Sequence, residues 1–284
     1  MRRRDMLAAT GAATLGLTAF PFGWTAAAAE GKRPRILYFT RSAGFQHGVV
    51  ALKNGDLSFS DKVFIELGKK HGFDVECSKD GRLFDGDLDK YDCLAFYTSG
   101  NLTKENKRSP AMSPEGKQKL LDAIAAGKPF VGIHAATDTF RSGGVDPFIE
   151  MIGGEFAGHG AQQKAMQKVA SPKFPGVGDF GDGFELHEEW YTFKKFNPDM
   201  RVILVQETGD MKGGAYNIPP YPATWARMHG KGRVFYTSLG HREDVWTGEP
   251  FQKVLLGGLS WALGQADADV TPNFKQSTPD APTA

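Results

Sequence analysis

Short apolar runs alternate with amphipathic segments along the first half of the chain. The apolar runs predict buried strands at residues 35–40, 73–78, 93–99 and 129–133. Between them, residues 61–72 and 113–127 carry apolar side chains at helical spacing. Strands that alternate with helices are typical of an α/β fold with a mainly parallel sheet and helices on both of its faces.

After Gly153 the pattern changes to shorter and more polar strands. They are predicted at residues 164–170, 185–193, 201–208, 223–229 and 233–238. The last two are joined by a Gly-Lys-Gly turn, which indicates a hairpin, and a helix follows at about 250–263. We therefore expect one domain over residues 33–264. Residues 265–284 are rich in Pro, Thr, Asp and Ala and are predicted to be a disordered tail.

The first 29 residues have the pattern of an export signal. Three arginines at positions 2–4 precede a moderately apolar stretch, and small residues near Ala29 offer a cleavage site. The arginine run is similar to a twin-arginine signal, although Met6 stands where such signals usually have Phe. An uncleaved anchor is the alternative, but the stretch is short and weakly apolar for a membrane span. We expect a periplasmic or secreted protein with no membrane association after cleavage.

The charge balance excludes some classes of partner. Lys and Arg total 34 against 33 Asp and Glu, so no nucleic acid is expected to bind. No nucleotide cofactor is evident, and a homo-oligomer is left open. Cys77 and Cys93 each lie in an apolar run, which favours buried free thiols over a metal or redox motif, with a disulfide between them as the alternative.

Candidate catalytic and metal-binding residues lie where the predicted strands end. In open α/β sheets, ligands bind outside the carboxyl ends of the strands. Four histidines lie in glycine-bearing loops at such ends: His47, His134, His159 and His241. Asn101 follows another strand. A single loop histidine is usually a surface residue or a hydrogen-bonding strut, but the shared position of four favours a common site.

The predicted strand at residues 185–193 adds a carboxylate to the candidate histidines. If it is one extended strand, His187, Glu189 and Tyr191 point to the same side. This face is either the solvated side of an edge strand or a source of a carboxylate for proton transfer or metal binding. We take Glu189 as a candidate catalytic residue.

The strand at 129–133 runs into a sharp bend that holds His134. Enzymes with a nucleophile elbow mount a Ser or Cys at such a bend, whereas this chain presents an imidazole, which can act as a base or bind a metal. Asp138, four residues on, is a candidate orienting partner for His134.

Several motifs, taken in order, resemble those of the ThuA-like (trehalose-utilisation) family. They are ILYFTRSAGFQHG, GKPFVGIHAATDTF, IGGEFAGHG, HEEWYTF and PATWARMHGKGRVFYTSLGHREDVW. The resemblance implies a class I glutamine amidotransferase-like fold with a flavodoxin-like core, and a link to carbohydrate metabolism beside sugar oxidoreductases. That superfamily carries a nucleophilic Cys where this chain has His134, so glutaminase activity is not expected.

The leading hypothesis is an exported enzyme that acts on a disaccharide or a keto-glycoside as a lyase, isomerase or hydrolase. In it, His134, Glu189 and Asp138 are catalytic, and His134, His159 and His241 hold a divalent metal such as Zn or Mn. The residues expected to contact the sugar are His47, Asn101, Tyr191 and Trp246. The alternative is a non-catalytic carbohydrate-binding or accessory protein with the same fold.

Overall fold

The computed structural model describes residues 32–284, so the predicted export signal at 1–29 lies outside the described residues. Within this part of the chain, nine strands form one sheet in the order β2-β1-β3-β4-β11-β10-β9-β6-β7. Their bounds are β1 Arg35–Phe39, β2 Asp74–Ser78, β3 Cys93–Phe96, β4 Phe130–Ile133, β6 Gln163–Val169, β7 Gly183–Glu188, β9 Arg201–Gln206, β10 Tyr221–His229 and β11 Gly232–Thr237. A separate antiparallel pair consists of β5 (Glu155–His159) and β8 (Tyr191–Lys194).

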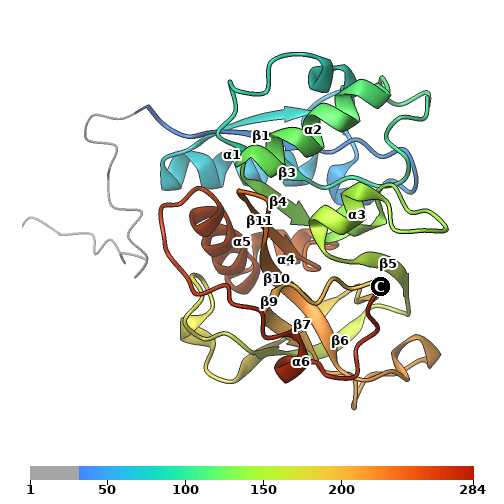
Figure 1. Ribbon diagram of the computed structural model, residues 1–284, viewed down its shortest axis with the longest axis vertical. Coiled ribbons are helices and arrows are strands. Elements are labelled where there is room, and N and C mark those ends of the chain that lie inside the picture. The colour runs from blue at the N-terminus through green and yellow to red at the C-terminus, as the bar shows by residue number, and fades with distance from the viewer. Residues whose placement is uncertain (1–31) are drawn as a thin grey trace, which may run out of the picture.

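The large sheet has a parallel and an antiparallel half. Strands β2, β1, β3, β4 and β11 pair in parallel, in the upper part of Figure 1. Strands β10, β9, β6 and β7 continue the sheet with antiparallel pairing. The expected flavodoxin-like arrangement is therefore present in the parallel half, which includes β11 from the end of the chain, and other strands after Gly153 form the antiparallel half.

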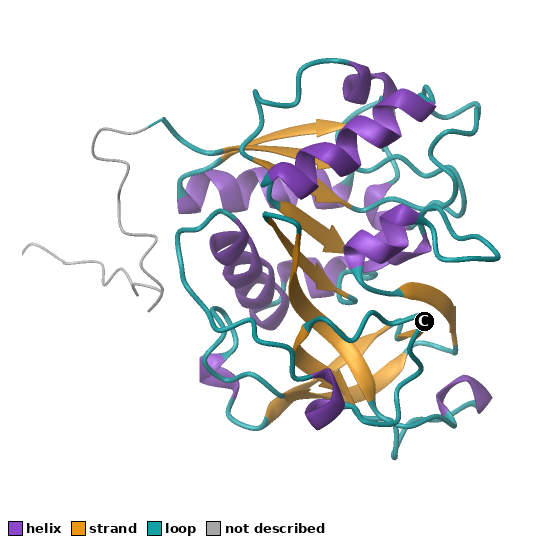
Figure 2. Cartoon of the chain, viewed as in Figure 1, coloured by secondary structure: helices purple, strands orange, loops and turns teal. Residues whose placement is uncertain are grey.

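Helices cover both faces of the parallel half (Figure 2). Buried residues of α1 (Phe59–His71) and α5 (Glu249–Ala262) belong to one apolar core, and those of α2 (Pro114–Ala126) and α3 (Pro147–Ile152) belong to the other. Two short helices complete the set: α4 (Glu243–Thr247) directly precedes α5, and α6 (Phe274–Ser277) follows it. Among residues 32–284, no helix is long and apolar enough to cross a membrane.

The alternation of side chains along β1 explains the two cores. Ile36 and Tyr38 point into the core with α1, while Leu37 and Phe39 point into the core with α2, and all four are fully buried. A strand that is buried on both faces requires a continuous apolar run, which is the pattern of a central parallel strand.

The two cysteines are free thiols, as expected. Cys93 is buried in β3, and Cys77 is half-buried in β2. Burial raises the pKa of both thiols, so neither is a ready nucleophile at neutral pH.

The expectation of a disordered tail after residue 264 is wrong for its final part. Phe274 is buried, and its ring centroid lies 5.6 Å from that of Phe196. The side-chain oxygen of Asn273 accepts a hydrogen bond of 2.6 Å from the backbone N–H of Val202, and Thr283 pairs with Phe196 as a β-bridge. The composition is polar, but one apolar anchor and several backbone bonds fix this segment to the domain.

Candidate metal centre

The bend after β4 is a sharp elbow that carries a histidine. Strand β4 ends at Ile133, and the chain turns at once into a 3-10 turn over His134–Asp138. His134 has a φ of 43°, in the left-handed region that residues other than glycine seldom adopt. Gly132 lies just before the bend, and a Cβ there would lie 2.8 Å from Cδ1 of Ile152, so a larger residue would force that side chain to shift. The elbow holds His134 fully buried.

Three further side chains converge on His134. His47 comes from the loop after β1, His241 from the loop after β11, and Glu189 from the connection between β7 and β8. These residues offer four ligand atoms that all lie within 4.8 Å of one another. One carboxylate oxygen, Oε2 of Glu189, lies 2.9 Å from Nδ1 of His241, 3.4 Å from Nε2 of His134 and 3.7 Å from Nε2 of His47.

The tautomer of His134 is fixed by a backbone carbonyl. Nδ1 of His134 donates a hydrogen bond of 2.6 Å to the carbonyl oxygen of Ser238, because a carbonyl can only accept. Burial lowers the pKa of His134 to about 3, so the ring is neutral at pH 7. Its Nε2 therefore presents a lone pair toward the carboxylate of Glu189.

The lone pair on Nε2 of His134 and the carboxylate of Glu189 would repel each other unless a cation lay between them. Burial by itself would raise the pKa of Glu189, but the surrounding histidines, among them His241 at 2.9 Å, outweigh this effect and lower the pKa, so Glu189 is anionic. Nε2 of His134 and Nδ1 of His241 are buried and have no hydrogen-bond partner among the described residues. Such orphaned atoms are uncommon in folded proteins and can mark the place of an ion.

The spacing of the donors fits a divalent cation. Ligands about 2.0–2.1 Å from a tetrahedral metal lie about 3.3 Å from one another. The distances of 2.9 to 3.7 Å from Glu189 to the three rings bracket this value. The cluster of His47, His134, Glu189 and His241 could therefore hold a metal ion.

His159 lies beside this cluster rather than within it. It ends β5, and its side chain is 44 % exposed. Its Nδ1 lies 3.4 Å from Oε1 of Glu189, the oxygen that is turned away from the other histidines. The structure thus brings His159 to Glu189, as expected, but the four-residue ligand set takes His47 in its place.

Glu188 is a candidate site residue that the sequence reasoning missed. Residues 185–193 do not form one strand, because β7 ends at Glu188 and Tyr191 begins β8 in another sheet. Glu188 is fully buried, and its Oε2 accepts hydrogen bonds from the backbone N–H groups of Gly240 (2.9 Å) and His241 (3.1 Å). Burial raises the pKa of Glu188 to about 7. Two successive glutamates before an aromatic residue were the available signal, and Glu188 positions the loop that carries His241.

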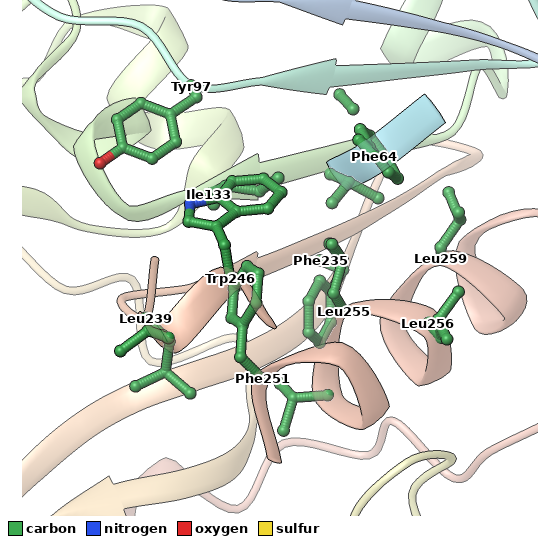
Figure 3. Close-up of a cluster of buried hydrophobic side chains, with 14 of the residues drawn as sticks. Phe64, Tyr97, Ile133, Phe235, Leu239, Trp246, Phe251, Leu255, Leu256 and Leu259 are labelled. Carbon is green, nitrogen blue, oxygen red and sulfur yellow. The ribbon is translucent and has the colours of Figure 1, made fainter. Parts of the chain in front are cut away.

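The expected stacking roles of Tyr191 and Trp246 do not agree with their burial. Tyr191 is 3 % exposed, its ring centroid lies 4.0 Å from that of His134, and its hydroxyl lies 3.1 Å from Nε2 of His47. Its ring therefore packs against His134, while its hydroxyl contacts the nitrogen of His47 that faces Glu189. Trp246 is fully buried in the core beside Tyr97 and Phe251 (Figure 3), and its Nε1 donates to the carbonyl of Gly240. No face of Trp246 is available to a sugar.

Asp138 and Asn101 also lie away from the roles expected of them. Asp138 forms an ion pair with Arg141, and His134 is oriented instead by the hydrogen bond that it donates to the carbonyl oxygen of Ser238. Burial raises the pKa of Asp138 to about 6. Asn101 is exposed, and its side chain accepts hydrogen bonds from Thr103, which stabilises a local turn.

Comparison with known proteins identifies relatives of the whole domain. The family profile described as ThuA, trehalose utilisation, matches residues 35–262. A ThuA-like protein from Parabacteroides merdae has a similar structure, with a TM-score of 0.65, 17 % identity, and coverage of 89 % of this chain and 95 % of that one. A ThuA-like protein from Bacteroides uniformis gives a TM-score of 0.61 at 17 % identity, with coverage of 82 % and 93 %.

A part of one sugar hydrolase has the same architecture. The cold-adapted β-galactosidase from Rahnella sp. R3 gives a TM-score of 0.51 at 12 % identity, over 82 % of this chain but 32 % of that one. No curated protein sequence matches the chain. At these identities the solved structures establish the fold, which is that of ThuA-like proteins with a class I glutamine amidotransferase-like architecture.

Proposed function

The chain belongs to the ThuA (trehalose utilisation) family, and from that premise we propose that it is a metal-dependent enzyme of carbohydrate utilisation that acts on a disaccharide or a keto-glycoside. The observation that carries the proposal is the neutral, orphaned Nε2 of His134, which faces the carboxylate of Glu189 at 3.4 Å. A buried arrangement of this kind is costly unless a cation completes it.

His47, His134, Glu189 and His241 would hold the metal. Imidazole and carboxylate ligands suit Zn or Mn, and Glu189 supplies the negative charge that three neutral rings lack. When bound, a divalent ion polarises a carbonyl or hydroxyl oxygen and stabilises negative charge that develops there. Glu188 holds the backbone of His241 in register with the other ligands.

His159 is the best candidate for proton transfer. Its Nδ1 donates a hydrogen bond of 2.9 Å to the carbonyl oxygen of Gly160, so the neutral ring has its lone pair on Nε2. The ring is half exposed at the side of the cluster, where a substrate can reach it. In a keto-glycoside, Nε2 of His159 would take the proton from the carbon next to the carbonyl, a step that leads to elimination or isomerisation.

Glutaminase chemistry is not supported. The elbow carries His134 in place of a thiol, and the two cysteines lie in strands β2 and β3 with raised pKa values. An imidazole at the elbow cannot form the thioester that such chemistry requires.

We also propose that the protein works outside the cytoplasm. The arginine run and apolar stretch within residues 1–29 support export by a twin-arginine route, which would place the mature protein in the periplasm or the medium. Export in the folded state would allow the metal site to be loaded before transfer.

Metal analysis combined with an assay tests the proposal. We expect purified protein to contain about one divalent ion per chain and to convert trehalose or its keto form to a product detectable by mass spectrometry. His159→Ala should lower turnover at least 100-fold, the usual contribution of a positioned acid or base, with the metal content unchanged. Sugar binding without any product would instead favour the accessory-protein alternative. Full activity of metal-free protein would contradict the proposal.

A further inference from the structure

A large aromatic side chain is exposed beside the candidate metal centre. Phe45 is 69 % exposed, more than any other large apolar side chain among the described residues. Its ring centroid lies 5.0 Å from that of His47, with the two rings nearly perpendicular. Single exposed apolar residues are common on protein surfaces, so the position of Phe45 matters more than its exposure.

The backbone around Phe45 is held firmly in place. The carbonyl oxygen of Ser99 accepts hydrogen bonds from the N–H groups of Ala43 (2.8 Å) and Gly44 (3.0 Å). The hydroxyl of Ser99 donates to the carbonyl of Phe45 (2.5 Å), and Arg108 donates to the carbonyl of Gly44 (2.8 Å). The exposed position of Phe45 is therefore set by the loop and not by a lack of contacts.

Close packing keeps this loop against the end of β3. Gly100 has a φ of 73°, and a Cβ on it would lie 2.3 Å from the backbone nitrogen of Gly44. On the inner side, the rings of Tyr97 and Tyr191 lie 5.5 Å and 6.4 Å from that of His47. The space inward of His47 is thus filled, and the ring of Phe45 contacts His47 while it remains exposed to solvent.

We propose that Phe45 is the platform on which the substrate's sugar ring stacks, which makes the substrate a pyranoside that presents an apolar C–H face. This inference rests on the proposed function. The C–H groups on one face of a pyranose carry a slight positive charge and match the negative face of an aromatic ring. Phe45 would then supply the stacking role that burial denies to Trp246 and Tyr191.

A purely structural role predicts a different result. If Phe45 only shields His47 from water, its removal should weaken metal binding and leave sugar binding to the metal-loaded protein unchanged. If it is a platform, its removal should weaken sugar binding and leave metal binding unchanged.

Calorimetric titration of metal-loaded protein with trehalose and with methyl α-D-glucopyranoside separates these roles. For Phe45→Ala we expect sugar affinity to fall about tenfold, the upper end for an aromatic contact, while the metal content stays at the wild-type level. Phe45→Trp should keep or improve the affinity. Met228→Ala is the matched control, since Met228 is also exposed but lies at the hairpin end of β10, at the opposite end of the strands.

Each outcome decides the matter. An unchanged sugar affinity in Phe45→Ala, or a loss of metal as the sole effect, overturns the role of Phe45 and leaves the proposed function standing. If the wild-type protein binds none of trehalose, methyl α-D-glucopyranoside and the keto form of trehalose, both the role of Phe45 and the proposed function are overturned. An equal loss of affinity in Met228→Ala also overturns the role of Phe45.

Discussion

The backbone carbonyl of Ser238 lies 2.6 Å from Nδ1 of His134 and so decides which nitrogen of that ring is free to bind a metal. The pairing of β4 with β11 fixes this contact, because Thr237 is in register with Ile133, just before the two residues. The orientation of His134 is therefore a property of the sheet and does not depend on the side chain of residue 238.

Ser238→Ala should accordingly leave the metal affinity within about twofold of the wild type, since the carbonyl stays. His134→Gln should lower it by more than about 100-fold, beyond the effect typical of residues outside the ligand set. Competition with a chromophoric chelator measures both. A strong loss in Ser238→Ala would show that the hydroxyl, not the carbonyl, matters.

Tyr191→Phe should raise the metal affinity by up to about tenfold with the fold intact, because the ring stays against His134 while the hydroxyl that competes for the lone pair on Nε2 of His47 is lost. Tyr221→Phe is a matched control. The hydroxyl of Tyr221 is buried and has no hydrogen-bond partner among the described residues, so its removal should change nothing. Equal affinities in all three proteins would contradict a competition between the Tyr191 hydroxyl and the metal.

Asp138 should make stability depend on pH. Its pKa is raised by burial to about 6, from an ordinary value of 3.8. A raised folded-state pKa gives stability that is fully present below pH 3.8 and is lost as the pH rises through 6. Asp138→Asn lacks this loss, so the free energy of unfolding of the variant relative to that of the wild type should increase by about 2 kcal/mol between pH 4 and 7. Urea unfolding at several pH values measures this difference, and a constant difference would refute the assignment.

Trp246→Phe should destabilise the domain without affecting sugar recognition. The substitution leaves a cavity and removes the hydrogen bond from Nε1 to Gly240, so the free energy of unfolding should fall by about 1–3 kcal/mol. Sugar affinity, measured by calorimetry well below the unfolding temperature, should match the wild type. A selective loss of sugar affinity would restore Trp246 to the binding site.

The convergence of the histidines could be predicted from the sequence because it follows from topology. His47, His134 and His241 come after β1, β4 and β11, which are parallel strands of one sheet, so the chain leaves all three at the same edge. The elbow could also be anticipated, since a buried strand ran directly into a run of small residues.

The remaining errors have a common physical origin. The alternation of side chains along residues 185–193 predicts one strand. In the structure, however, the chain passes from one sheet to another between Glu188 and Tyr191. Sequence periodicity cannot reveal such a change of sheet. Trp246 and Asp138 were assigned from residue type, whereas burial and ion pairing depend on distant parts of the chain. The carbonyl of Ser238, which orients His134, belongs to the backbone, so residue identity cannot reveal its role.

The packing of Phe274 against Phe196 means that the segment matched by the family profile is shorter than the unit that folds. A shortened protein that ends at residue 262, where the profile match ends, would uncover Phe196 and remove the Asn273 contact with Val202. We expect such a protein to aggregate or to melt at a lower temperature than one that retains residues 263–284. Recombinant work on relatives should therefore choose its boundaries from the packed chain.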